Sequence, residues 1–243
     1  MAIIAEKRGK GSDLLPSTIF VESESMPDPI QGIHHITAIA SDPQRNLDFY
    51  TQVLGLRLVK LTVNFDDPGT YHFYLGDASG HPGTILTFFP WPDIRPGRRG
   101  PGQVTAVGFN IPSGAIGYWS ERLKQRGVEV FTPLRRFDAD VLPFADPDGL
   151  PLELVASDVP APGAPWAGSD IPAEQAIHGF AAPTLTLSEG SGTAGLLVDV
   201  FGLHPAGQEG SRQRFTSQAV AGGQVDIALQ PGEPLGRMGS GVV

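Results

Sequence analysis

Three segments of this 243-residue chain repeat one pattern of predicted elements, and that repeat constrains the fold more than any other feature. Each segment opens with a β-branched run, continues with apolar residues at helical spacing, and closes with further strand-like runs. The first strands of successive copies lie roughly 70 to 75 residues apart, a period typical of stacked supersecondary units. The pattern therefore predicts an α+β protein built from tandem β-α-β-β-β units with bent mixed sheets.

The first copy is the clearest. Its opening strand is expected at residues 32–40, and Asp42 followed by Pro43 is typical of the start of a helix, which Gly55 would end. Turn-forming residues separate the strands that follow. We expect these strands at residues 56–63, 71–75 and 84–89.

The second and third copies follow the same order with weaker signals. In the second, the pattern predicts a helix at residues 116–126, closed by Gly127, and strands at residues 104–111, 128–131, 136–144 and 152–155. In the third, it predicts a short helix that ends near Gly202, with strands at residues 178–187, 213–220 and 224–229.

Stretches rich in Pro and Gly mark the borders between units. We expect an N-terminal arm at residues 1–30, units at 31–91, 103–157 and 176–230, and a linker with the start of a truncated fourth unit at 231–243.

Composition excludes several classes of function. Cysteine is absent, so a metal must be held by nitrogen and oxygen ligands. A net charge of −9 disfavours nucleic acid as a partner. No apolar run approaches the roughly 20 residues of a membrane-spanning helix, and the first residues lack a secretory signal pattern. We therefore expect a cytoplasmic protein without membrane partners.

Two adjacent histidines open the first strand, and alternation places them on opposite faces. His34 shares its face with small and apolar residues, as expected of the side packed under a helix. His35 shares the other face with Thr37, which we expect to be open to solvent. A histidine on an open strand face is a candidate ligand, although histidine in a strand more often has a structural role.

Repeated units with a histidine on the first strand resemble the vicinal-oxygen-chelate superfamily, which includes glyoxalases, bleomycin-resistance proteins and extradiol dioxygenases. The similarity extends from about residue 32 to the end, and within the superfamily it narrows to dioxygenases that cleave hydroquinone rings. The motifs that carry it are GIHHIT at 32–37, DFY at 48–50, VLGLRLVK at 53–60, YHFYL at 71–75 and GHPGT at 80–84.

This resemblance implies an Fe(II) site with two histidines and one carboxylate, which leaves open positions for a ring hydroxyl and O2. Mn(II) or another divalent metal is the alternative cofactor. The first ligand falls on His35, while His34 and Thr37 match neighbouring residues that orient ligand or substrate. The implied partners are a small aromatic substrate and O2, and unpaired sheet edges favour a homo-oligomer.

The family's second histidine and its glutamate match nothing in this sequence and would belong to a fourth unit. Glu153 lies where such repeats place a metal carboxylate on a last strand, so it is the second candidate ligand. His72 and Tyr74 alternate on one strand and are expected to face the same cup. Because two of the three expected ligands are missing, we expect this chain to bind iron weakly and to turn over slowly or not at all.

Two other functions remain open. A glyoxalase-type isomerase or lyase would combine His35 with Glu153 and residues of a partner chain around another divalent metal. A metal-free protein of the bleomycin-resistance type would instead sequester an aromatic ligand in the cup. Tight ligand binding that is unaffected by a chelator would distinguish the last possibility.

Overall fold

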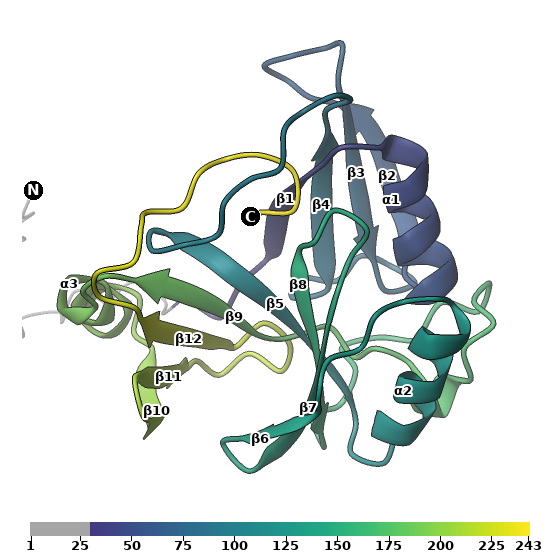
Figure 1. The fold of residues 1–243 in the computed structure, drawn as a ribbon. Coiled ribbons are helices and arrows are strands. Elements are labelled where there is room, and N and C mark those ends of the chain that lie inside the picture. The colour runs from purple at the N-terminus through teal and green to yellow at the C-terminus, as the bar shows by residue number, and fades with distance from the viewer. Residues whose placement is uncertain (1–29) are drawn as a thin grey trace, which may run out of the picture.

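The computed structural model describes residues 30–243, and the arm expected at residues 1–30 lies almost wholly outside them. The first unit forms a four-stranded sheet in the order β1-β4-β3-β2, in which β1 runs parallel to β4 (Figure 1). Its elements are β1 (His35–Ala40), α1 (Pro43–Asp48), the π-helical turn η1 (Phe49–Val53), β2 (Arg57–Val63), β3 (Tyr71–Gly76) and β4 (Ile85–Pro90). The Asp42 side chain accepts a hydrogen bond from the Arg45 N–H (2.7 Å), which fixes the start of α1.

The second and third units join into one eight-stranded sheet, because β5 and β9 pair antiparallel. The strand order is β10-β11-β12-β9-β5-β8-β7-β6. The second unit comprises β5 (Gln103–Pro112), α2 (Ile116–Gln125), β6 (Leu134–Arg136), β7 (Ala139–Ala145) and β8 (Pro151–Ser157). After the 3₁₀ turn η2 (Ala173–Gln175), the third comprises β9 (Phe180–Leu187), α3 (Ser191–Gly195), η3 (Leu196–Val200), β10 (His204–Glu209), β11 (Arg212–Thr216) and β12 (Gln224–Leu229).

The predicted fold class is confirmed, since the order β-α-β-β-β occurs three times and the sheets are mixed. Two details of the prediction are wrong. The strand expected at residues 128–131 is only an isolated bridge between Val130 and Phe144. Strand β10 was not expected, because its sequence His-Pro-Ala-Gly-Gln-Glu has low β propensity.

The main core lies between the helices and the sheets of the first two units. On β1, alternation buries Ile36, Ala38 and Ala40 beneath α1, as the sequence predicts. The largest fully buried side chains of this core are Tyr50, Phe88, Phe109, Trp119, Phe144 and Phe180. A smaller cluster around Leu197, Phe215 and Ile227 fills the third unit.

Polar contacts hold the first two units together. Tyr50 Oη donates to Asp146 Oδ2 (3.0 Å) in the turn between β7 and β8. Asp148, in the same turn, accepts hydrogen bonds from Ser41 (2.8 Å from its N–H) and from Arg45 Nη2 (2.8 Å). Burial raises the pKa of Asp146 to about 6. The turn between β7 and β8 thus contacts η1 through the buried carboxyl group of Asp146. It contacts the start of α1 through the ion-paired carboxylate of Asp148.

The C-terminal segment returns to the first unit (Figure 1, yellow). It runs beside the linker that precedes β5, with bridges that pair Pro96 with Ser240 and Arg98 with Arg237. Val242 then pairs antiparallel with Ile39 on the edge of β1 that β4 does not occupy. The two backbone hydrogen bonds at Ile39 both measure 3.0 Å.

Among residues 30–243, no helix has the length and apolar character that crossing a membrane requires.

Candidate functional site

The face of the four-stranded sheet opposite the core carries the polar side chains that the sequence singles out. Strand register places Thr37 opposite Thr87, and Thr87 opposite Tyr74. Thr87 Oγ1 donates to Thr37 Oγ1 (2.9 Å). Because directly opposed residues point to the same side of a sheet, His35 and His72, two positions along from Thr37 and Tyr74, share this face. We call it the His35 face.

His35 is exposed at the start of β1, and its ring meets that of His34 edge-on. The two Nδ1 atoms lie 3.2 Å apart, so one of them donates to the other. Burial of part of the ring, and then the neighbouring His34, lower the pKa of His35. A neutral His35 whose Nδ1 carries the shared proton presents a free lone pair at Nε2, which is the form that binds a metal.

His72 lies on the same face and is held by aromatic rings. Its ring centroid is 4.3 Å from that of Tyr74 and 4.1 Å from that of Phe89. Burial is the main factor that lowers the pKa of His72, and the charges of His35 and Lys60 add to it. Its Nε2 is buried and has no hydrogen-bond partner among the described residues. His72 Nε2 is therefore an unpaired polar atom that is closed to solvent in this structure.

Lys60 closes the far side of this face. It stands opposite Tyr74 across the β2–β3 pair, and its Nζ lies 5.0 Å from the centre of the Tyr74 ring. A cation over one side of an aromatic ring is a favourable contact. The His35 face thus combines imidazoles, hydroxyl groups, aromatic rings and one amine.

A glycine-rich junction between the two sheets fixes where β1 begins. The Gly83 N–H donates to His34 O (2.9 Å), and the Ile33 N–H donates to Gly222 O (2.9 Å). Gly83 has φ +84°, and a Cβ there would lie 2.5 Å from Ala221 O. Gly222 has φ +69°, and a Cβ there would lie 2.7 Å from Ile33 O. Side chains are excluded at both positions, so the junction holds the histidine pair in place.

The structure does not bring Glu153 to the His35 face. Glu153 lies on β8 of the eight-stranded sheet, where both of its carboxylate oxygens accept hydrogen bonds from Arg136 (2.6 and 3.0 Å). His178 is also apart, since its Nδ1 contacts Val159 O (2.8 Å). Within residues 30–243, no group of three or more His, Asp or Glu side chains could hold a metal ion. The metal-ligand roles of His35 and Glu153 stay predictions.

Thr87 and Lys60 are members of this face that the sequence reasoning missed. The sequence indicates them only weakly, because each is simply a polar residue at an alternate position of a strand. Thr87 lies between Ile85 and Phe89 in this way. Recognising it requires knowledge of which strands are neighbours.

Known proteins resemble this chain in sequence. Residues 32–154 match the model of the family described as Glyoxalase/Bleomycin resistance protein/Dioxygenase superfamily. MhqO of Bacillus subtilis, provisionally named a ring-cleaving dioxygenase, is 45% identical over 218 residues, which are 90% of this chain and 69% of that protein. The chlorohydroquinone/hydroquinone 1,2-dioxygenase of Sphingobium indicum is 35% identical over 196 residues, 78% of this chain and 60% of that protein.

Solved structures give the same result. A crystal structure of a provisionally named dioxygenase from Bacillus subtilis superposes with a TM-score of 0.84 at 45% identity, covering 88% of this chain and 68% of that one. Glyoxalase I from Zea mays superposes with a TM-score of 0.64 at 14% identity, covering 87% of this chain and 72% of that one, a likeness of fold alone.

Proposed function

Because the chain belongs to the glyoxalase/bleomycin resistance protein/dioxygenase superfamily, we propose that its His35 face is the substrate side of a ring-cleaving dioxygenase site. The substrate is a hydroquinone-like or catechol-like ring, and O2 is the second substrate. The observation that carries the proposal is the set of side chains on this face, where His35, Thr37, His72 and Tyr74 line one open surface. The names of the relatives support the reaction class.

The side chains of this face suit a phenolic ring. Tyr74 and Phe89 offer aromatic surface, and aromatic pairs add about 0.5–1.5 kcal/mol beyond the burial of area. The unpartnered His72 Nε2 is buried, so it would exchange a hydrogen bond with a ring hydroxyl only after the ring turns towards the substrate. The Thr37 hydroxyl, which accepts a hydrogen bond from Thr87, is a second polar group that orients the substrate.

The described residues do not make a complete iron site. An Fe(II) site of this type requires two histidines and a carboxylate, and His35 is the one such ligand on this face that we assign. His34 acts as a positioning residue, because its Nδ1 contacts His35 Nδ1, and His35 keeps Nε2 free for a metal when its own Nδ1 is the donor in that contact.

We propose that the remaining ligands reach His35 across the outer edge of β1. In the eight-stranded sheet, β9 pairs antiparallel with β5 on the side that β8 leaves free. Val242 begins the same kind of pairing with Ile39 beside β1. A β-α-β-β-β unit paired there would place its side chains next to His35.

The proposal is tested by ring cleavage in a form extended by the part of MhqO that follows the matched region. After anaerobic loading with Fe(II), hydroquinone and O2 are added and the ring-opened product is measured. We expect His35→Ala to lower kcat/KM by at least about 100-fold, because a ligand is lost. His204→Ala is the control, since His204 is exposed on β10, and it should retain full activity.

Three outcomes would overturn the proposal. Ring cleavage that survives His35→Ala would remove His35 from the site. Tight binding of hydroquinone without cleavage in the extended form, unaffected by a chelator, would instead indicate a binding protein. Isomerase activity on a glutathione adduct would indicate the glyoxalase-type alternative.

A further inference from the structure

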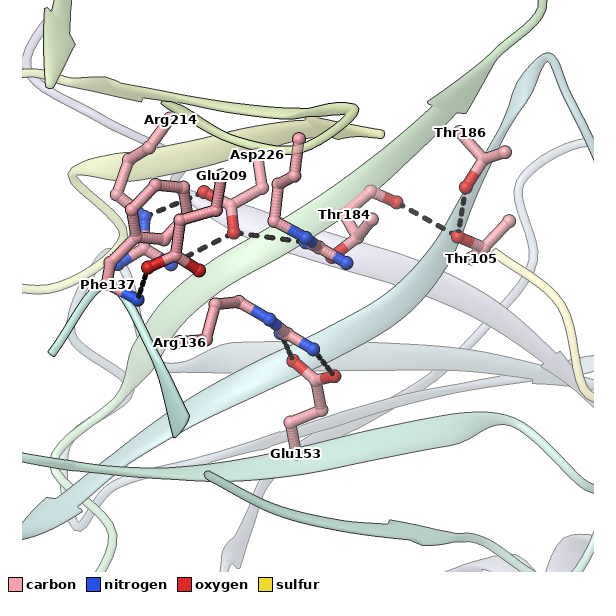
Figure 2. A network of polar contacts seen from close by, with 10 residues as sticks. Thr105, Arg136, Phe137, Glu153, Thr184, Thr186, Glu209, Arg214 and Asp226 are labelled. Atoms are coloured by element: carbon pink, nitrogen blue, oxygen red, sulfur yellow. Dashed lines mark hydrogen bonds and ion pairs between the residues drawn. The ribbon is translucent and has the colours of Figure 1, made fainter. Parts of the chain in front are cut away.

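A second polar cluster lies on the eight-stranded sheet, on the face opposite its core (Figure 2). We call it the arginine cluster, and it comprises Arg136, Arg212 and Arg214 with the carboxylates Glu153 and Asp226. Glu153 stands opposite Gly108, and Asp226 stands opposite Thr184. Each carboxylate therefore stands on the last strand of its unit, opposite the first strand, as Thr87 stands opposite Thr37 in the first unit.

Each carboxylate is bound by guanidinium groups. Arg136 holds Glu153 through two hydrogen bonds of 2.6 and 3.0 Å, and Arg214 holds Asp226 through two of 2.7 and 2.9 Å. The Arg214 guanidinium also lies 4.3 Å from the centre of the Phe137 ring. Such two-pronged pairs fix the geometry of both partners.

Arg212 is the third cation and is only partly paired. Its Nη1 donates to Thr184 Oγ1 (2.7 Å) and to Asp226 Oδ2 (3.1 Å), although Arg214 already holds that carboxylate. Within residues 30–243, no hydrogen bond runs from its Nε or Nη2. The Arg212 side chain is 19% exposed, so solvent or a solute reaches it.

The charges in the cluster do not balance. Three guanidinium groups face two carboxylates, and the five side chains are between 1% and 19% exposed. Burial and then the charge of Arg136 lower the pKa of Arg212. A shielded site with one surplus positive charge and free N–H donors favours an anion.

Space for a ligand adjoins the cluster. A cavity of about 380 Å³ is lined by Asn110, Phe137, Val155, Arg214 and Gln224, among others. Asp138, Asp140 and Asp158 also line this cavity, and all three are exposed. Carboxylates at the mouth repel a polyanion more strongly than a singly charged molecule.

From this arrangement we propose that the arginine cluster binds a small molecule with a single carboxylate group, which pairs with the free N–H donors of Arg212. One carboxylate balances the surplus charge and matches the planar guanidinium fork. This site is independent of the function proposed for the His35 face.

The test is binding of benzoate to the full chain, measured by calorimetry and by the arginine Nε–Hε signals in NMR spectra. We expect saturable binding to one site that shifts the Arg212 signal. Arg212→Met should weaken binding at least about tenfold, because a hydrogen-bonded ion pair is lost. Arg135→Met is the matched control, since Arg135 is 62% exposed on the same strand as Arg136, and it should leave benzoate binding unchanged.

The following results would overturn the proposal. Equal binding by wild type and Arg212→Met, or the same signal shifts with sodium chloride at matched ionic strength, would mean screening rather than a site. Tighter binding of inorganic phosphate than of benzoate would contradict the single-carboxylate class. If Arg212→Met does not fold, the wild-type Arg212 signal still decides, because a benzoate site requires it to shift while the Arg135 signal stays in place.

Discussion

Asp146 is the residue whose ionisation is coupled most directly to folding. It is buried, accepts a hydrogen bond from Tyr50, and has a pKa of about 6 in the folded chain against 3.8 for an ordinary aspartate. Between these two pH values the folded state binds more protons than the unfolded state. The free energy of unfolding should therefore fall as the pH rises from about 4 to about 6, and then level off.

Asp146→Asn removes this titration while it keeps an oxygen for the N–H groups of Asp148 and Leu150. We expect the variant to lose a slope of up to about 1.4 kcal/mol per pH unit over that window. Urea unfolding at several pH values measures the slope. The control is Asp140→Asn, whose carboxylate is 60% exposed, and identical slopes in wild type and Asp146→Asn would refute the assignment.

At the same scale, alternation predicts the side of β1 on which His35 lies, whereas His34, expected on the packed side, is exposed and precedes the strand. His35 and Thr37 lie on the open face, as expected. The contacts of Thr37 with Thr87, and of His72 with Phe89, depend on the pairing of strands distant in the chain. No local sequence feature specifies those partners, so the sequence alone could not predict all the residues of the His35 face.

Among the helices, α2 is hydrogen-bonded to the first unit through the side chain of Arg122. Arg122 Nε donates to Val53 O and its Nη2 to Gln52 O, both at 2.8 Å, at the end of η1. The side chain is only 10% exposed. The amphipathic pattern predicts α2 itself, but an arginine that binds carbonyl groups of another unit has no signature in the sequence.

Arg122→Met should lower the free energy of unfolding by about 2–3 kcal/mol, because it removes charged hydrogen bonds to the Val53 and Gln52 carbonyls and the ion pair with Asp170. Arg126→Met is the control. Arg126 is 37% exposed and pairs with Asp170, so its loss should cost no more than about 1 kcal/mol. Equal losses in the two variants, measured by urea unfolding, would show that Arg122 does not join the units.

The strands that the sequence misplaces have two separate causes. Strands β6 and β7 turn through Phe137 and Asp138, both with positive φ (46° and 64°). Two-residue hairpin turns usually contain Asn, Asp or Gly, and Phe137 is not one of these residues. The sequence pattern therefore predicted one longer strand at residues 136–144. Strand β10 contains Pro205 and Gly207 and is fully exposed. Its position at the edge of the sheet tolerates residues that a central strand would exclude.

For the whole molecule, the outer edge of β1 is a strand edge that is open to further pairing along most of its length. In the described part of the chain, only Val242 pairs with it, at Ile39. Unpaired strand edges promote association. We expect copies of this chain to self-associate, as sedimentation velocity at increasing concentration would reveal.

Thr37→Pro tests the role of that edge. Thr37 lies two residues from Ile39, so its N–H points to the same outer edge. Proline removes this donor and should reduce association, whereas Thr37→Val removes only the hydroxyl group and should not. Equal association of the two variants would mean that copies meet through another surface.

The central claim is that the His35 face is one half of an iron site that is completed across β1. The measurement that tests it most directly is iron content with hydroquinone-dependent O2 uptake after anaerobic Fe(II) loading. It compares the 243-residue chain with the form extended by the C-terminal part of MhqO. We predict substoichiometric iron and little O2 uptake in the 243-residue chain, and one iron per chain with rapid uptake in the extended form. Full iron occupancy and rapid uptake in the 243-residue chain alone would contradict the account.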